Sequence, residues 1–125
     1  MSGILLLYIG SILVFCWGIA HLFPTKNIVK GFGNISPDNR LIITMEWITE
    51  GVALIFIGIL TALVAYTDQL SNLAIVVYWI VFGVLNVLSL VSLFTGFRHP
   101  FILFKLCPFI FTGSSLFIII GSLLK

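Results

Sequence analysis

Glu46 and Glu50 lie four residues apart inside the apolar segment 37–66. Residues at this spacing share one face of a helix, so both carboxylates should lie on one stripe. Two negative charges this close repel each other unless a proton or a nearby cation intervenes. Carboxylates are costly inside a membrane-spanning helix, where they usually mark a functional site. The pair therefore predicts an inward-facing polar site within an apolar helix.

The side chains that could complete this site come from other segments. His21 lies at the end of the first apolar segment, and Arg98 and His99 form a basic corner between the last two. We expect His21, together with Arg98 or His99, to neutralise the glutamates unless one of them holds a proton. Asn86 adds an amide near the middle of the third apolar segment. The predicted ligand-binding residues are His21, Glu46, Glu50, Asn86, Arg98 and His99.

Three interpretations of this cluster stay open. In the first, the charges pair and only fix the register of the helices. In the second, they line a cytoplasm-facing pocket for the polar or cationic head of a lipid, quinone or small amphiphile. In the third, His21, Glu46, Glu50 and His99 bind a divalent metal or pass protons. The sequence has no HxxxH or ExxH pair that would favour a metal site. Whether the cluster binds a metal is therefore unknown from the sequence, and no cofactor is predicted.

Composition restricts the class of protein. Of the 125 residues, 61% are apolar and only 8% are charged, against about 25% charged in soluble domains. The net charge of +2, without a basic run, does not suggest a nucleic-acid partner. Cys16 and Cys107 lie in different segments without a CxxC motif, which argues against a thiol-disulfide enzyme, a zinc finger and attached c-type haem. No serine or cysteine has a base beside it in the sequence, so an enzyme is not the favoured class.

Four apolar segments must position these residues. Each is long enough to cross a hydrocarbon layer of about 30 Å. The first lacks the positive n-region of a signal peptide and is therefore predicted to be a retained span. The predicted fold is all-α, an integral membrane antiparallel four-helix bundle, with residues 1–125 forming a single transmembrane domain. Its predicted spans are 3–23, 37–66, 73–97 and 101–124, with a loop at 24–35.

Charge placement predicts the orientation in the membrane. One end of the predicted bundle carries Lys26, Lys30, Arg40, Arg98 and Lys105, whereas the other end carries only Lys125. Positively charged loops usually face the cytoplasm. We therefore expect both termini on the outer side of a membrane, for which a bacterial inner (plasma) membrane is the expected location.

Glycines at regular spacing indicate close helix contacts. Gly3 and Gly10 share one face of the first span, and Gly51 and Gly58 lie on the second. Small residues let helix backbones approach closely in lipid. Because one four-helix bundle is thin-walled for an aqueous pore, transport would require a homodimer. These glycine faces are the predicted contact for such an oligomer.

The sequence GIAHLFP at residues 18–24, followed by a short loop in a chain of four spans, resembles small four-span DoxX-like bacterial membrane proteins. The resemblance implies a four-span architecture and assigns no residue roles. The leading prediction is a binding or accessory membrane protein with a polar intramembrane site for a lipid-like or amphiphilic ligand. The alternatives are a small oligomeric transporter or channel for an ion or small cation, and an intramembrane or metal-dependent enzyme. The predicted partners are membrane lipid, an amphiphilic small molecule, and another copy of the chain or a larger membrane complex.

Overall fold

The computed structural model describes residues 2–68 and 70–124, and every regular element in that range is a helix. The helices are α1 (Ser2–Leu22), α2 (Thr25–Gly31), α3 (Pro37–Asp68), α4 (Asn72–Phe94) and α5 (Ile102–Leu123). All except α2 are long and apolar enough to cross a membrane. The all-α class and the four long apolar helices are therefore as the sequence predicts.

The outward faces of the long helices are as apolar as their contacts with one another. Phe56, Leu63, Ile80 and Phe109 are each more than half exposed, and many other large apolar side chains share this state. A soluble monomer rarely exposes continuous apolar surface of this kind. Such a surface is suited to contact with lipid tails, which supports the assignment as a membrane protein.

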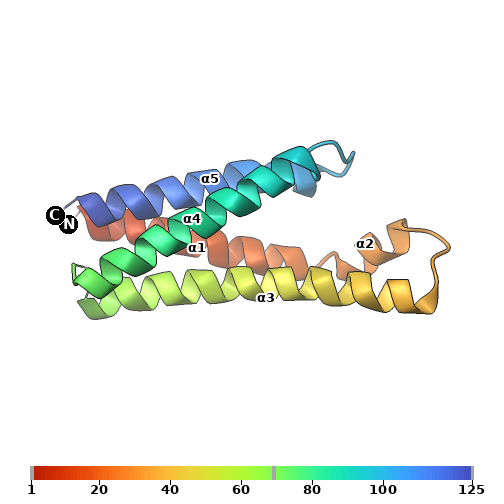
Figure 1. Cartoon of the computed structure of the whole chain (residues 1–125), viewed down its shortest axis with the longest axis horizontal. Helices are drawn as coiled ribbons and strands as arrows, with labels where there is room; N and C mark the ends of the chain where they lie inside the picture. The colour runs from red at the N-terminus through yellow and green to blue at the C-terminus, as the bar shows by residue number, and fades with distance from the viewer. Residues whose placement is uncertain (1, 69, 125) are drawn as a thin grey trace.

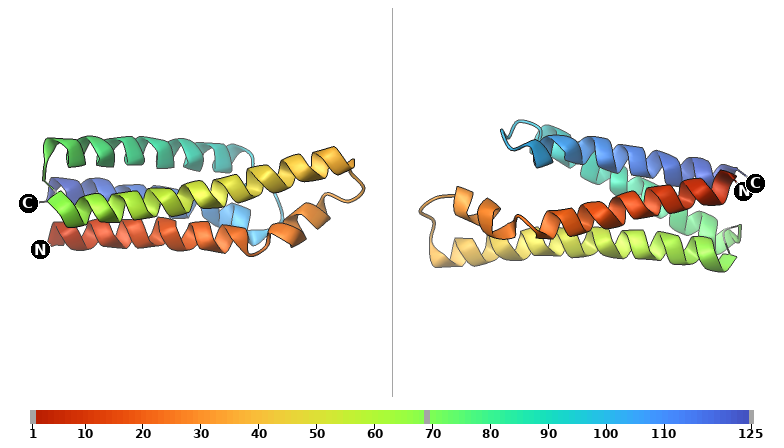
Figure 2. Two further views of the ribbon diagram at one scale, coloured as in Figure 1. Left: turned by 90° about the horizontal axis from the view of Figure 1, so that it is seen from below. Right: turned by 180° about the vertical axis from the view of Figure 1, so that it is seen from behind.

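Helix α1 holds the structure together (Figure 1). It packs against α3 on one side and α5 on another, and α4 packs mainly against α5. Helices α3 and α4 share a turn but make far fewer contacts, and Figure 1 and the right view of Figure 2 show them separating towards the corner that joins α4 to α5. Both ends of the chain lie at the opposite end of the molecule from that corner.

Glycines set the close contacts of α1. A Cβ atom added at Gly18 would lie 2.8 Å from the carbonyl oxygen of Gly51 on α3. A Cβ atom added at Gly121 on α5 would lie 2.7 Å from the carbonyl oxygen of Gly3. Because real side chains do not tolerate such distances from a backbone oxygen, α1 can approach both neighbours only through residues without a Cβ atom.

This packing corrects the predicted dimer contact. The glycines proposed for a homodimer are all buried inside the chain, where they face α5 or α1: Gly3, Gly10, Gly51 and Gly58. Sequence spacing indicates that a helix face can be approached closely, but it does not say whether the neighbour belongs to the same chain. These faces are therefore not available to a second copy.

The segment before α3 differs from the predicted loop. Residues after Pro24 form the short helix α2, whose Val29 is buried and which packs on α3. Helix α3 then begins with Ser36 as its N-cap, because the Ser36 hydroxyl accepts the backbone N–H of Asn39 at 3.2 Å. At 32 residues, α3 is about 48 Å long. It therefore exceeds the thickness of a hydrocarbon layer, and its first turns extend beyond the α4–α5 corner (Figure 1).

A polar seam joins α4 to α5. The Asn86 amide donates to Ser115 Oγ at 3.1 Å. Ser89 Oγ lies 3.0 Å from the carbonyl oxygen of Pro108 and 2.7 Å from Thr112 Oγ1. In a membrane such groups have few alternative partners, so hydrogen bonds across the helices satisfy them.

Candidate functional site

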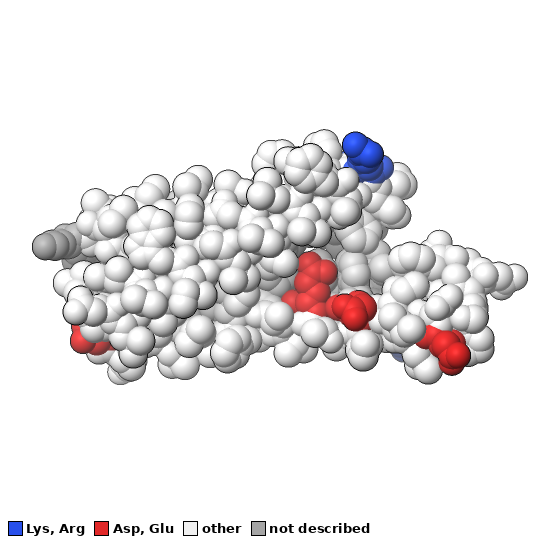
Figure 3. Space-filling model, in the orientation of Figure 1, with Lys and Arg blue, Asp and Glu red and all other residues white. Residues whose placement is uncertain are grey.

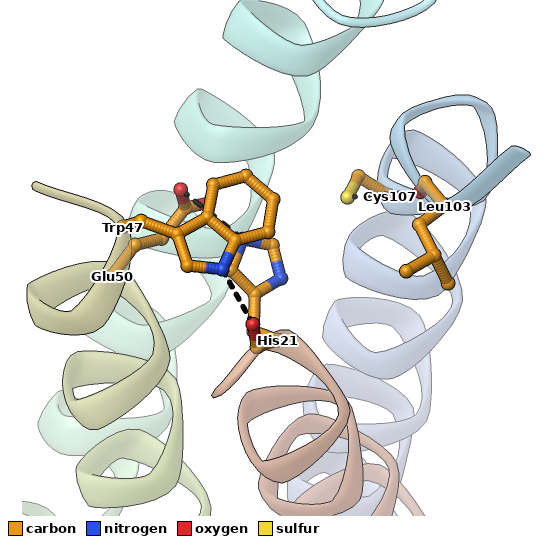
Figure 4. A network of polar contacts seen from close by, with 5 residues as sticks. All are labelled: His21, Trp47, Glu50, Leu103 and Cys107. Atoms are coloured by element: carbon orange, nitrogen blue, oxygen red, sulfur yellow. Dashed lines mark hydrogen bonds and ion pairs between the residues drawn. The ribbon is translucent and has the colours of Figure 1, made fainter. Parts of the chain in front are cut away.

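The last turn of α1 meets α3 at Trp47. The imidazole of His21 stacks on the Trp47 indole, with ring centroids 4.2 Å apart and planes 16° from parallel (Figure 4). Trp47 Nε1 donates a hydrogen bond of 2.6 Å to the carbonyl oxygen of His21. The last four carbonyls of a helix have no partner within that helix. Trp47 therefore fixes the end of α1 by satisfying one of them.

The same histidine contacts a carboxylate. His21 Nε2 lies 3.3 Å from Glu50 Oε2, and Figure 4 shows Glu50 and Trp47 reaching His21 from the same helix. The side chain of His21 is 5% exposed, whereas that of Glu50 is 38% exposed. The contact is close enough for an ion pair when His21 is protonated, although it does not have the geometry of a hydrogen bond.

Local sequence explains this geometry. Trp47 and Glu50 are three residues apart on α3 and so lie on neighbouring positions of one face. Gly51 directly follows Glu50 and lies against the backbone of Gly18 on α1. Because α1 approaches so closely at Gly51, the end of α1 reaches both Trp47 and Glu50. The contact between Gly18 and Gly51 thereby holds the rings of His21 and Trp47 and the carboxylate of Glu50 together.

Two cavities open beside Glu50. The larger, of about 510 Å³, is lined mainly by residues of α3, Glu46 and Glu50 among them, together with Ile28, Phe32, Leu88 and Phe104. The smaller, of about 300 Å³, is lined by residues of α1, α3, α4, α5 and the α4–α5 corner: His21, Glu50, Val91, Ser92, Thr95, Gly96, His99, Phe104 and Cys107. Glu50 and Phe104 line both. We call the two cavities together the α3–α4 cleft; Figure 3 shows acidic atoms inside a hollow at this position.

Aromatic rings form part of the lining of the cleft. The Phe104 ring contacts Trp47 edge-on, with centroids 5.4 Å apart, and contacts His99 at 4.8 Å. His99 Nδ1 accepts the backbone N–H of Phe101 at 3.2 Å. Phe104 therefore connects α3 to the α4–α5 corner and keeps His99 beside the cleft.

Four of the six predicted site residues line the cleft. His21, Glu50 and His99 share the smaller cavity, and Glu46, which is exposed, lines the larger one with Glu50. The other two lie elsewhere. Asn86 is used by the seam with α5, and the exposed Arg98 lines none of the described cavities because α4 ends at Phe94 and leaves the residues after it in turns.

The aromatic part of the cleft is not among the residues predicted from the sequence. Trp47 lies three residues before Glu50, so the two share a helix face. This spacing could have predicted that Trp47 lies beside the site. Phe104 and Leu88 carry no such signal, because each is one of many apolar residues in its helix. Cys107 lines the smaller cavity, but its thiol donates to the carbonyl oxygen of Leu103 at 3.3 Å within α5.

The arrangement is not that of a metal centre. Across residues 2–68 and 70–124, no group of three or more His, Cys, Asp or Glu side chains is placed to hold a metal ion. His21 and Glu50 alone provide two ligands. A search of family models, curated proteins and solved structures finds no match to this chain. The geometry of the cleft is therefore the basis for assigning a function.

Proposed function

We propose that this protein is a membrane protein that binds an amphiphile in the α3–α4 cleft, with the polar head at Glu50 and the tail along the apolar wall. The observation that carries this proposal is the Glu50 carboxylate, which remains 38% exposed inside a cleft with mainly apolar walls. A carboxylate with unused acceptor sites in such surroundings is poorly solvated by its neighbours. A bound head group with hydrogen-bond donors would satisfy it.

The chemistry of the cleft favours a head group with positive charge. Glu46 and Glu50 both line the larger cavity, and no lysine or arginine among the described residues lines it with them. The Phe104 ring lines the same cavity and is only partly buried, so it can attract an ammonium group through its π-electrons. Ala53 and Leu88 offer an apolar surface for the chain that such a group carries. An alkylamine or another basic amphiphile combines these features.

The proposed membrane arrangement is an antiparallel bundle with up-down-up-down topology, as in the DoxX-like proteins that the sequence resembles. Two observations support it: both chain ends lie at one end of the molecule, and the α4–α5 corner and α2 lie at the other. Lys26, Lys30, Arg40, Arg98 and Lys105 belong to this second end. The positive-inside rule then favours a cytoplasmic cleft, with both termini on the outer side of a bacterial inner membrane.

Two other functions have less support. A small oligomeric transporter or channel was predicted to use the glycine faces for dimer contact, and these are used inside the chain. A metal-dependent enzyme would need a ligand set that the described residues do not provide. Binding of an amphiphile requires neither.

A direct test uses Trp47 as a reporter. In the background W17F/W79F, Trp47 is the one tryptophan left in the sequence, and its fluorescence should respond to an amphiphile in the cleft. Dodecylamine titrated into the protein in nonionic micelles should give a saturable change. Glu50→Gln should weaken this binding by about tenfold, since a charge-assisted hydrogen bond contributes roughly 1.5–3 kcal/mol before allowance for partial exposure.

Two controls make the result specific. Asp68→Asn removes the same charge at the exposed far end of α3 and should leave dodecylamine binding unchanged. Dodecanol, which has the same chain without the charge, should bind the parent protein and Glu50→Gln with similar affinity. Equal losses for Glu50→Gln and Asp68→Asn would show that only net charge matters, and would refute the proposed site.

A further inference from the structure

A second concave surface lies outside the cleft, between α2 and the first turns of α3. It encloses about 490 Å³. Its lining consists of Thr25, Lys26, Asn27, Val29, Lys30, Arg40, Leu41 and Thr44. Lys26, Lys30 and Arg40 are all exposed cations, and no acidic residue among those described lines the surface with them. We call it the basic pocket.

The fold brings these three cations together. Lys26 and Lys30 are four residues apart and therefore share one face of α2. The buried Val29 helps to hold α2 against α3, whose first turn contains Arg40. Within residues 2–68 and 70–124, the one close ion pair is between His21 and Glu50. The three cations thus repel one another with no carboxylate paired to them, unless an anion lies between them.

We propose that the basic pocket binds a phosphate group, as carried by the head of an anionic phospholipid. Arginine offers a planar fork that matches phosphate oxygens, and lysine contributes a compact charge. The hydroxyl groups of the lining do not supply free donors, because Thr25 donates to the carbonyl oxygen of Leu22 and Thr44 to that of Arg40. Recognition therefore depends on the three cations and on the Asn27 amide.

The surroundings favour a lipid over free phosphate. Leu41 lines the pocket and is 69% exposed, so an apolar side chain lies beside the cations. The start of α3 extends past the α4–α5 corner, which would place it at head-group depth when the long helices cross a membrane. Basic residues at that depth attract anionic lipid. The pocket shares no residue with the two cavities of the α3–α4 cleft, so this proposal and that for the cleft can fail separately.

The test compares lipids that differ in head-group charge. The full chain in nonionic detergent is titrated with phosphatidylglycerol or phosphatidylcholine of the same chain length, and bound lipid is counted by native mass spectrometry. Phosphatidylglycerol should bind more tightly. Substituting glutamine for Lys26, Lys30 or Arg40, one at a time, should weaken its binding by roughly fivefold, equivalent to about 1 kcal/mol per basic residue near a membrane surface. All three side chains are exposed, so circular dichroism should show unchanged helix content.

Lys105→Gln is the matched control, because Lys105 lies at the same end of the molecule and lines none of the described cavities. It should leave phosphatidylglycerol binding unchanged. Inorganic phosphate at millimolar concentration forms a separate arm. If phosphatidylglycerol binds preferentially and inorganic phosphate neither binds nor displaces it, the pocket is a site for lipid head groups. If the protein shows no lipid preference but forms a phosphate adduct that Arg40→Gln removes, the pocket is a site for free phosphate. Equal weakening by Lys105→Gln and Arg40→Gln, or the absence of both lipid preference and phosphate adduct, would overturn the proposal.

Discussion

Helix α3 meets α1 and α4 in different ways. Towards α1 it presents Gly51 and Gly58, and the two backbones come into direct contact. Towards α4 it makes far fewer contacts, and the two helices separate after their shared turn (Figure 1). The cleft with Glu50 occupies that separation. Helix α3 therefore has a closed side, which packs against α1, and an open side, which faces the cleft. The adjacent residues Gly51 and Glu50 belong to the closed and the open side, respectively.

The difference follows from the forces available in lipid. Apolar side chains gain little by moving from lipid tails to another helix, so association depends on close van der Waals contact and hydrogen bonds. Small residues supply close contact between α1 and α3. On α4, Gly83 is exposed, and a Cβ atom added there would have no neighbour within 4 Å. The open side thus lacks the contact that closes the other, and a cleft can persist there.

The largest expected effect comes from adding bulk on the closed side. A Cβ atom at Gly58 would lie 2.7 Å from Phe15 Cβ and 2.8 Å from the carbonyl oxygen of Ser11. Gly58→Leu should therefore force α1 away from α3 and lower the free energy of unfolding by about 3 kcal/mol or more, at the upper end for overpacked cores. Unfolding in mixed micelles with increasing dodecyl sulfate, followed by circular dichroism, measures it.

Gly83→Leu is the control on α4, where the added side chain meets open space. It should not lower the free energy of unfolding, and the higher helix propensity of leucine should raise it by up to about 1 kcal/mol. If both variants lose equal stability, the contrast between a closed and an open side is wrong. A loss confined to Gly58→Leu would place the structural requirement on the α1–α3 contact.

Much of the cleft could be predicted because membrane topology is a strong constraint. Hydropathy predicts the long helices, and consecutive spans place the end of the first and the start of the second at the same face of the membrane. That reasoning grouped His21 with Glu50, which lie 3.3 Å apart. It needed no knowledge of packing, since both residues lie near the same end of adjacent helices.

Packing explains what the sequence could not predict. Asn86 has the same polar character as a site residue, but its amide bonds to Ser115 in the α4–α5 seam. Whether a polar side chain faces a cavity or a neighbouring helix depends on helix rotation, which hydropathy does not determine. The short helix α2 was also missed, because seven residues after a proline carry too little periodicity to separate a helix from a loop. The basic pocket depends on that helix.

A smaller loss of stability is expected at Trp47, where the contact between α1 and α3 borders the cleft. Trp47→Phe keeps an aromatic ring beside His21 but removes the donor to the His21 carbonyl oxygen. The buried carbonyl loses its hydrogen bond, so the free energy of unfolding should fall by about 1–2 kcal/mol. Trp79→Phe is the control, since Trp79 is half exposed and contacts Phe82 edge-on. The same dodecyl sulfate titration measures both, and a stable Trp47→Phe variant would show that the indole does not fix the end of α1.

The smallest effect is expected in the seam that attaches α4 to α5 by hydrogen bonds. Ser89 Oγ lies 2.7 Å from Thr112 Oγ1. A double-mutant cycle with Ser89→Ala and Thr112→Val should give a coupling free energy of about 0.6 kcal/mol, the average for such bonds between membrane helices. Ser89 Oγ also donates to the Pro108 carbonyl oxygen, so Ser89→Ala, which loses both contacts, should cost more than the coupling. A coupling larger than the loss in Gly58→Leu would mean that hydrogen bonds, rather than close glycine contacts, dominate the stability of this protein.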